Sequence, residues 1–310
     1  MEAPQLIKAR PVPHPGRIAG AIVAALVAIT IVSSLVTNPK YGWPTVGKWL
    51  FAPTIVRGVG YTLLLTVGAM VIGIALAALS ALMRQSENPV NRSVAWFYIW
   101  FFRGTPIYTQ LVFWGLLPSL YKQVQIGLPI GPQFVLGNTE TIFTPLVCAL
   151  IGLGLNEGAY LAEIFRSGWN AVDPGQAEAA RALGMSPSRI RWRIVAPQAM
   201  RVIIPPTGNE TISMLKTTSL VVAIPVTNEL YYAANRIGQR YYTVIPMLIV
   251  AAIWYLAVTS LLMVVQHFIE AYYGRGTQSQ KQRKTKAQTR QDAINQSSTV
   301  KVDPFLEYTP

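Results

Sequence analysis

The stretch of sequence that decides the fold reads AVDPGQAEAARALGMSPSRIRWRIVAP and covers residues 171–197. Asp173, which is followed by proline, is typical of a helix N-cap, and Gly184 supplies the stop signal for that first helix. Ser186, again followed by proline, begins a second short helix, which we expect to end at Pro197. The stretch therefore predicts two short helices that meet at a sharp angle outside any apolar segment.

Apolar segments long enough to cross a bilayer flank this stretch on both sides. Hydrophobic residues make up 52% of the 310-residue chain and charged residues only 13%, well below the share in a soluble domain. A spanning helix needs about 20 mostly apolar residues, and no segment shows the period-two alternation of a membrane β-barrel. The sequence thus predicts an all-α integral membrane protein with six transmembrane helices, near Ile18–Val36, Gly58–Met83, Gly104–Tyr121, Ile142–Phe165, Ile203–Val226 and Thr243–Ile269.

Residue types that catalyse reactions or bind metals are scarce. Cys148 is the single cysteine, which excludes a disulfide framework, and His14 lies far along the chain from His267, which disfavours a histidine metal site. The segment Gly42–Trp49 imitates a nucleotide-binding loop but lacks the serine or threonine that must follow Lys48 to hold magnesium. We therefore expect no catalytic residue, no metal and no nucleotide site in this chain.

Lysine and arginine are distributed unevenly over the loops between the predicted spans. Of the 26 basic residues, 19 lie in one alternate set of loops and termini, which includes the loop 166–202, and 6 lie in the other set. Because the loops richer in lysine and arginine face the cytosol, both termini and this loop are predicted to be cytoplasmic. The basic C-terminal tail is predicted to be disordered and able to touch anionic lipid, with no nucleic-acid partner.

The loop 166–202 resembles the EAA loop of ABC-transporter permeases. The family pattern is EAAxxxG, nine further residues and then IxLP, and Ala196 stands where the family prefers leucine. The resemblance implies a coupling helix that sits in a groove on a separate ATP-binding subunit, where small alanines permit close approach and charged side chains give directional contacts. The residues assigned to this coupling loop are Glu178, Ala179, Ala180, Arg181, Gly184, Ile194 and Pro197.

Three further motifs narrow the resemblance to permeases for polar amino acids. FFRGTP at 101–106, LNEGAYLAEIFRSG at 155–168 and LKTTSL at 215–220 resemble motifs of that subfamily, whose core has five spans. The expected parts are therefore a cytoplasmic segment (1–17), an extra transmembrane helix with an external loop (18–55), the permease domain (56–270) and the disordered basic tail (271–310).

This resemblance implies a permease subunit of an ATP-driven importer of polar amino acids in the bacterial cytoplasmic membrane. The expected partners are two ATP-binding subunits, which hold the ATP and magnesium, a second permease subunit, identical or homologous, and an extracytoplasmic amino acid binding protein. An ion-coupled secondary amino acid transporter is the alternative, and it requires internal repeats that the spans do not show. A membrane-embedded enzyme would need a nucleophile–base or metal constellation, which the sequence lacks.

Ionisable residues inside the predicted spans need a partner or a water-lined path, because an unpaired charge in the bilayer is costly. Glu157, next to Asn156, either contacts the cationic amino group of the substrate or pairs with Lys216. Thr218, two residues after this lysine, completes the candidates for the substrate path.

A second group of polar residues is expected to have structural or gating roles. Glu163 and Arg166 are three residues apart and predict an ion pair at a helix end. Glu210 lies near the start of the fifth predicted span and is interpreted as structural. Arg103 adjoins the break formed by Gly104, Thr105 and Pro106, where it is expected to order the freed backbone.

The coupling assignment leads to a first test. Replacing Glu178 by lysine is expected to abolish transport while membrane insertion is unchanged, because the reversed charge disrupts the contact with the ATP-binding subunit. Uptake of labelled substrate, with the amount of membrane-inserted chain as the control, measures this. Wild-type uptake by Glu178→Lys would contradict the coupling role.

Overall fold

The computed structural model describes residues 15–127, 133–224, 226 and 228–274, so most of the predicted N-terminal segment and basic tail lies outside the described residues. Turns of 3-10 helix at Pro39–Tyr41 and Thr218–Ala223 and a π-helical turn at Arg191–Val195 connect the longer elements. The elements in chain order are α1 (Pro15–Thr37), α2 (Trp43–Leu50), α3 (Pro53–Arg84), α4 (Pro89–Gly104), α5 (Ile107–Leu120), β1 (Gln123–Gly127), β2 (Gln133–Asn138), α6 (Thr139–Ile142), α7 (Pro145–Asn170), α8 (Pro174–Ala182), α9 (Pro187–Ile190), α10 (Ala196–Thr217), α11 (Leu230–Arg240) and α12 (Val244–Gly274).

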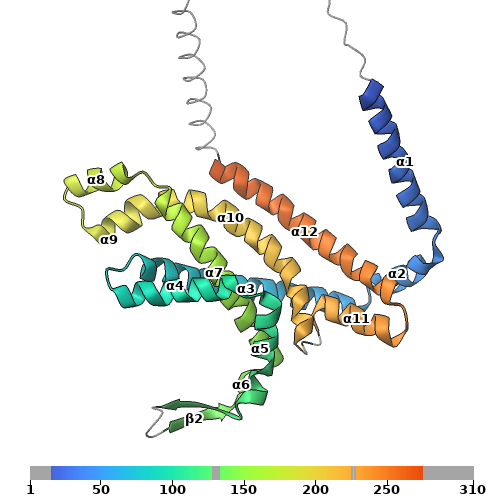
Figure 1. Ribbon diagram of the computed structural model, residues 1–310, viewed down its shortest axis with the longest axis horizontal. Helices are drawn as coiled ribbons and strands as arrows, with labels where there is room; N and C mark the ends of the chain where they lie inside the picture. Colours follow the sequence, from blue (N-terminus) through green and yellow to red (C-terminus); the bar gives the residue numbers. More distant parts are fainter. Residues whose placement is uncertain (1–14, 128–132, 225, 227, 275–310) are drawn as a thin grey trace, which may run out of the picture.

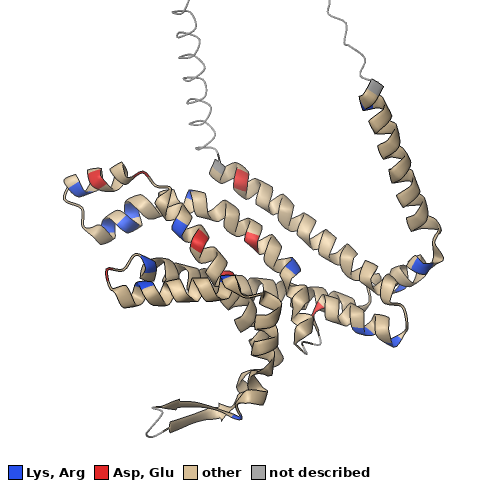
Figure 2. Ribbon diagram, viewed as in Figure 1, with Lys and Arg blue, Asp and Glu red and all other residues tan. Residues whose placement is uncertain are grey.

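Four helices among the described residues are long and apolar enough to cross a membrane, namely α1, α3, α7 and α12. The predicted count of six spans is not confirmed by this measure. The helix α5 is apolar but only 14 residues long, and α10 contains the prolines Pro205 and Pro206 together with charged side chains. Charged residues gather on α8, α9 and the helix ends and are sparse along the middle of the long helices (Figure 2).

The contact between α3 and α7 forms the centre of the bundle (Figure 1). Glycines bring the two backbones close together: a Cβ atom added at Gly154 would lie 2.6 Å from Ile72, and one at Gly158 would lie 2.8 Å from Leu76. The spacing of Gly154 and Gly158 is that of a GxxxG pair, which by itself is compatible with a dimer or with a contact within the chain. Both glycines make the intrachain contact, as expected where small residues let helices approach in a membrane protein.

Two hydrophobic cores lie along the bundle. The α7 core contains buried side chains from α7, the later part of α3, α4, α5 and the segment that follows α10. The α11 core contains side chains from α11, α2, the first turns of α3 and the first turns of α12. The helix α3 passes through both cores and thereby connects them.

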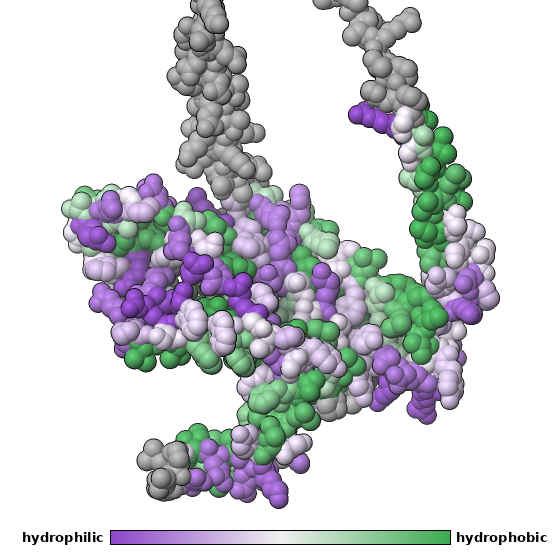
Figure 3. Space-filling view, viewed as in Figure 1, coloured by the Kyte–Doolittle hydropathy of each residue, from purple (hydrophilic) through white to green (hydrophobic). Residues whose placement is uncertain are grey.

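The helix α1 stands apart from both cores. None of its apolar window is buried within the chain, and the space-filling view shows it as a hydrophobic rod along most of its length (Figure 3). At 22 residues, the candidate span is about 33 Å long, which matches the hydrocarbon thickness of a bilayer. The extra first span was predicted, and its exposed surface fits a surrounding of lipid.

The region before Pro106 differs from the prediction. Residues 84–103 were assigned to a loop, but 89–104 form α4, which packs against α3 and α7 and buries Ala95 and Ile99. The segment was interpreted as a loop because Arg92 and Arg103 make it basic and because its aromatic residues are typical of the aromatic belt at the membrane interface. The belt and the helix are compatible, because the rings line the exposed side of a helix whose other side is packed.

A hairpin of two antiparallel strands, β1 and β2, extends from the bundle at the end of α5 (Figure 1). The sequence analysis predicted a plain loop there. A bulge between Val124 and Gln125 interrupts the strand register. The bulge and the shortness of the strands explain why no period-two pattern is visible in the sequence.

The tight contact at Gly158 leads to a prediction. Gly158→Val is expected to lower the free energy of unfolding by about 1–3 kcal/mol, because the new side chain would overlap Leu76 and the Tyr98 hydroxyl. Thermal unfolding of the purified chain in detergent measures the effect. Gly60→Ala is the control, since a Cβ atom there meets nothing within 4 Å. Equal unfolding temperatures for Gly158→Val and the wild type would contradict the packing argument.

Candidate functional site

The first candidate site is the helical unit formed by α8 and α9. The Asp173 side chain accepts a hydrogen bond from the backbone N of Gly175 at 2.8 Å, so the predicted N-cap is present. Gly184 has a φ of +76°, a conformation that favours glycine, and it turns the chain between the two helices. Ala180, Ile190 and Val195 form a small hydrophobic core of their own. This core holds the two helices as one unit, which extends from the end of the bundle (Figure 1).

One boundary in this unit was predicted wrongly. We expected Pro197 to end the second helix, but the chain continues from α9 through the π-helical turn at Arg191–Val195 directly into α10. Proline is tolerated because Pro197 occupies the first turn of α10, where its missing N–H is not needed. The π-helical turn changes the hydrogen-bond register at the junction. The second helix and α10 therefore form one continuous helical segment.

The coupling-loop residues divide into a buried and an exposed set. Ala180 is buried and Ile194 is half-buried, so these residues hold the unit together. Glu178, Ala179, Arg181 and Pro197 are exposed and available to a partner. The sequence analysis missed Leu183, whose side chain is 84% exposed at the C-terminal end of α8.

The second candidate site begins at the break between α4 and α5. Pro106 has no N–H, so the carbonyl of Phe102 loses its helical partner. Side chains supply the donors instead: Gln110 Nε2 donates to this carbonyl at 3.0 Å and Asn156 Nδ2 donates to it at 2.9 Å. Gln110 Nε2 also donates to the Thr105 carbonyl at 3.1 Å. Asn156, which was a candidate for the substrate path, therefore holds the break in place.

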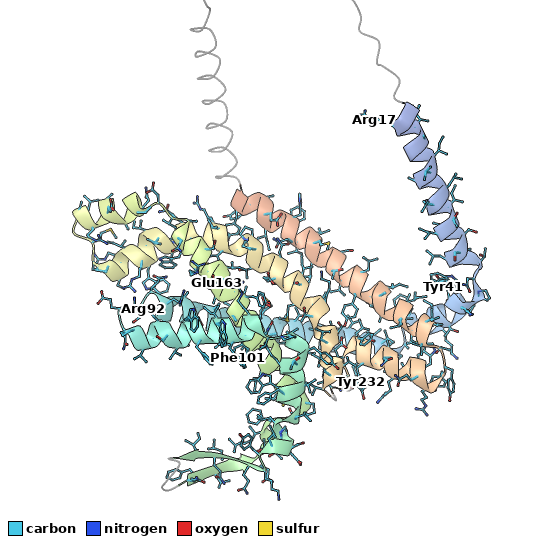
Figure 4. All side chains as sticks on the ribbon, viewed as in Figure 1. Arg17, Tyr41, Arg92, Phe101, Glu163 and Tyr232 are labelled. Carbon is cyan, nitrogen blue, oxygen red and sulfur yellow. The ribbon has the colours of Figure 1, made fainter. Side chains whose placement is uncertain are left out.

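A polar groove runs beside this break, between α4, α7 and α10. Arg103, Tyr160, Glu163 and Glu210 line a cavity of about 390 Å³, and the first three also line a neighbouring cavity of about 460 Å³ that reaches Arg84. Figure 4 shows Glu163 on α7, above the helix that carries Phe101 in this view. From the sequence, Arg103, Glu163 and Glu210 were expected to have separate structural or gating roles, and their position in one groove was not predicted.

The charges of the groove are only partly compensated. The predicted ion pair is present, with Arg166 Nη2 lying 2.7 Å from Glu163 Oε2. The Arg103 guanidinium lies 5.4 Å from the centre of the Tyr160 ring, a cation–π contact. Within the described part of the chain, neither Arg103 nor Glu210 forms an ion pair. Among the described residues, the groove therefore contains charged side chains of both signs, Arg103 and Glu210, that have no ion-pair partner.

The remaining path candidates lie elsewhere. Glu157 is 4% exposed, its Cγ atom faces Gly73 of α3, and its Oε1 atom has no hydrogen-bond partner among the described residues. Lys216 is exposed, and the ion pair with Glu157 is not formed within the described residues. Thr218 is buried and donates to the carbonyl of Leu215 at 2.8 Å. Glu157 is therefore the one buried carboxylate of α7 that still lacks a partner.

The architecture of an apolar helical bundle with a charged, projecting helical unit defines a membrane transport component. Residues 69–273 match the family described as "Binding-protein-dependent transport system inner membrane component". The chain belongs to this family, and the predicted all-α membrane fold and the resemblance to amino acid permeases are confirmed. It is a transport permease rather than an enzyme, and the comparisons do not support the ion-coupled alternative.

Particular relatives share much of the chain. The arginine transport system permease protein ArgU of Corynebacterium glutamicum is 52% identical over 276 residues, which cover 88% of this chain and 85% of ArgU. The L-cystine transport system permease protein TcyB of Bacillus subtilis is 36% identical, over 71% of this chain and 86% of TcyB. A crystal structure of an amino acid ABC transporter with histidines is similar with a TM-score of 0.59 and 33% identity, over 72% of this chain and 95% of that one.

The hydrogen bonds at the helix break lead to a prediction. Gln110→Leu is expected to cost about 1–3 kcal/mol of stability, because the backbone carbonyl of the half-buried Thr105 loses a donor. Thermal unfolding in detergent measures this cost. Gln125→Leu, on the exposed strand β1, serves as the matched control and is expected to unfold like the wild type. If the two variants unfold at the same temperature, the role assigned to Gln110 is wrong.

Proposed function

We propose that this chain imports a cationic amino acid, of which arginine is the best candidate, through the groove between α4, α7 and α10. The observation that carries the proposal is that Arg103, Glu163 and Glu210 line one cavity beside the aromatic ring of Tyr160. The 52% identity to an arginine transport permease supports the same substrate class.

The groove matches the chemistry of such a substrate. An amino acid carries a carboxylate, which the planar guanidinium of Arg103 can bind through two hydrogen bonds. The cationic side chain of the substrate requires an acceptor, and Glu210 has no ion-pair partner within the described residues. Glu157 does not line this groove, so its contact with an amino group of the substrate stays a prediction. Lys216 and Thr218 have lower priority, because neither lines this groove.

Transport requires partners that hold the nucleotide. Two ATP-binding subunits, which carry ATP and magnesium, dock on the exposed residues of α8, including Glu178 and Leu183. A second permease subunit, identical or homologous, completes the path, and an extracytoplasmic binding protein delivers the amino acid. Both termini and the α8–α9 unit lie in the cytosol of a bacterium, in agreement with the distribution of basic residues. ATP-driven movement of the docked helices then opens the path alternately to the two sides of the membrane.

The groove assignment is tested by uptake into proteoliposomes that contain the complete transporter. Labelled arginine is expected to be taken up and to be displaced by lysine or histidine, but not by glutamate. Glu210→Gln is expected to raise the KM for arginine about tenfold, because a charge-assisted contact to the substrate is lost.

The matched control is Glu87→Gln, which neutralises an exposed carboxylate in the turn between α3 and α4. This variant is expected to have the wild-type KM. Equal KM values for the Glu210→Gln and Glu87→Gln variants would refute the groove as the substrate site. Displacement of the label by glutamate alone would refute the substrate class.

A further inference from the structure

The side chain of Glu229, the residue before α11, is completely buried. One carboxylate oxygen accepts hydrogen bonds from Thr62 Oγ1 of α3, at 2.9 Å, and from the hydroxyl of Tyr255 of α12. The other oxygen accepts one from the backbone N of Tyr232, at 3.1 Å. The ion pairs of the described residues do not include this carboxylate, so its charge is balanced by hydrogen-bond donors and by the N-terminus of α11.

This carboxylate lies where the chain crosses from one hydrophobic core to the other. Val226 belongs to the α7 core, whereas Leu230 belongs to the α11 core. Along α3, Leu65 belongs to the α7 core and Val59 to the α11 core, and Thr62 lies between them. The carboxylate and the threonine hydroxyl that binds it therefore mark the same boundary on two separate elements.

A buried carboxylate is stable only while its donors stay in place. Hydrogen bonds to a charged acceptor are about twice as strong as those between neutral groups, and losing a donor leaves a desolvated charge. Glu229 precedes α11 and Tyr255 packs against the α11 core, so a displacement of this core along α3 would separate the carboxylate from Thr62. Intermediate arrangements of the two cores are therefore disfavoured, as expected for an element with discrete states.

We propose that Glu229 is a positioning residue that latches the α11 core to α3, the helix that also runs through the α7 core. The latch keeps the two cores in register until the ATP-driven step supplies the free energy to change their arrangement. It couples ATP hydrolysis to transport without touching the substrate. This inference rests on the proposed function, because the ATP-binding subunits supply the ATP-driven step.

The test uses the complete transporter in proteoliposomes and a matched pair of variants at Thr62. Thr62→Val keeps the shape of the side chain but removes the hydroxyl, whereas Thr62→Ser keeps the hydroxyl. Two quantities are measured: ATP hydrolysis without the binding protein, and the number of substrate molecules imported per ATP. Thr62→Val and Tyr255→Phe are expected to raise ATP hydrolysis without the binding protein. They are also expected to lower the number of substrate molecules imported per ATP about tenfold, as for the loss of a hydrogen bond to a charged group. Thr62→Ser is expected to behave like the wild type.

The outcomes separate a latch from a merely structural role. If Thr62→Val and Tyr255→Phe lower hydrolysis and import in equal proportion, or leave both unchanged, the latch is refuted. It is also refuted if Thr62→Ser loses coupling as strongly as Thr62→Val. Glu229→Gln is measured in parallel, and its thermal unfolding shows whether a loss of activity reflects loss of the fold. Wild-type proteoliposomes that neither hydrolyse ATP nor import arginine would refute the proposed function instead.

Discussion

The close contact between α3 and α7 is the constraint on which the rest of the structure depends. Glycines at Gly73, Gly154 and Gly158 remove the side chains that would hold the helices apart, so that dispersion contacts form along much of both helices. Because lipid is as apolar as the helix surfaces, this packing rather than the hydrophobic effect stabilises the pair. The elements that carry polar chemistry are arranged around this pair: α4 and α10 border the groove beside α7, and α11 is hydrogen-bonded to α3.

Satisfaction of backbone polar groups determines where the bundle departs from regular helices. At the break after α4, the amides of Gln110 and Asn156 supply donors that the proline removes. At the start of α11, a buried glutamate accepts from the backbone and from two other helices. In each case the irregular backbone is tolerated because it is packed inside protein, as required in a membrane. The irregular segments therefore lie where buried side chains supply the missing hydrogen-bond partners.

Much of the architecture could be predicted from residues that act locally. The caps at Asp173 and Gly184 and the uncharged runs of α1, α3 and α12 depend on neighbours in the sequence, and the structure contains them as expected. The groove could not be predicted, since it is formed by residues on three helices whose packing is set by distant glycines. Pro197 was misread for a related reason: whether a proline ends a helix or begins one depends on the hydrogen-bond register before it. Glu229 was overlooked because a loop residue carries no periodic signal.

The uninterrupted run from α9 through the π-helical turn into α10 has a mechanical consequence. Ile203 of α10 packs against Gly168 of α7, and the interior prolines Pro205 and Pro206 follow within the next turn, where they remove helical hydrogen bonds and favour bending. Glu210 lies beyond these prolines, about 10 Å further along the helix axis than Ile203. A displacement of the α8–α9 unit would therefore bend α10 at these prolines before it reached Glu210.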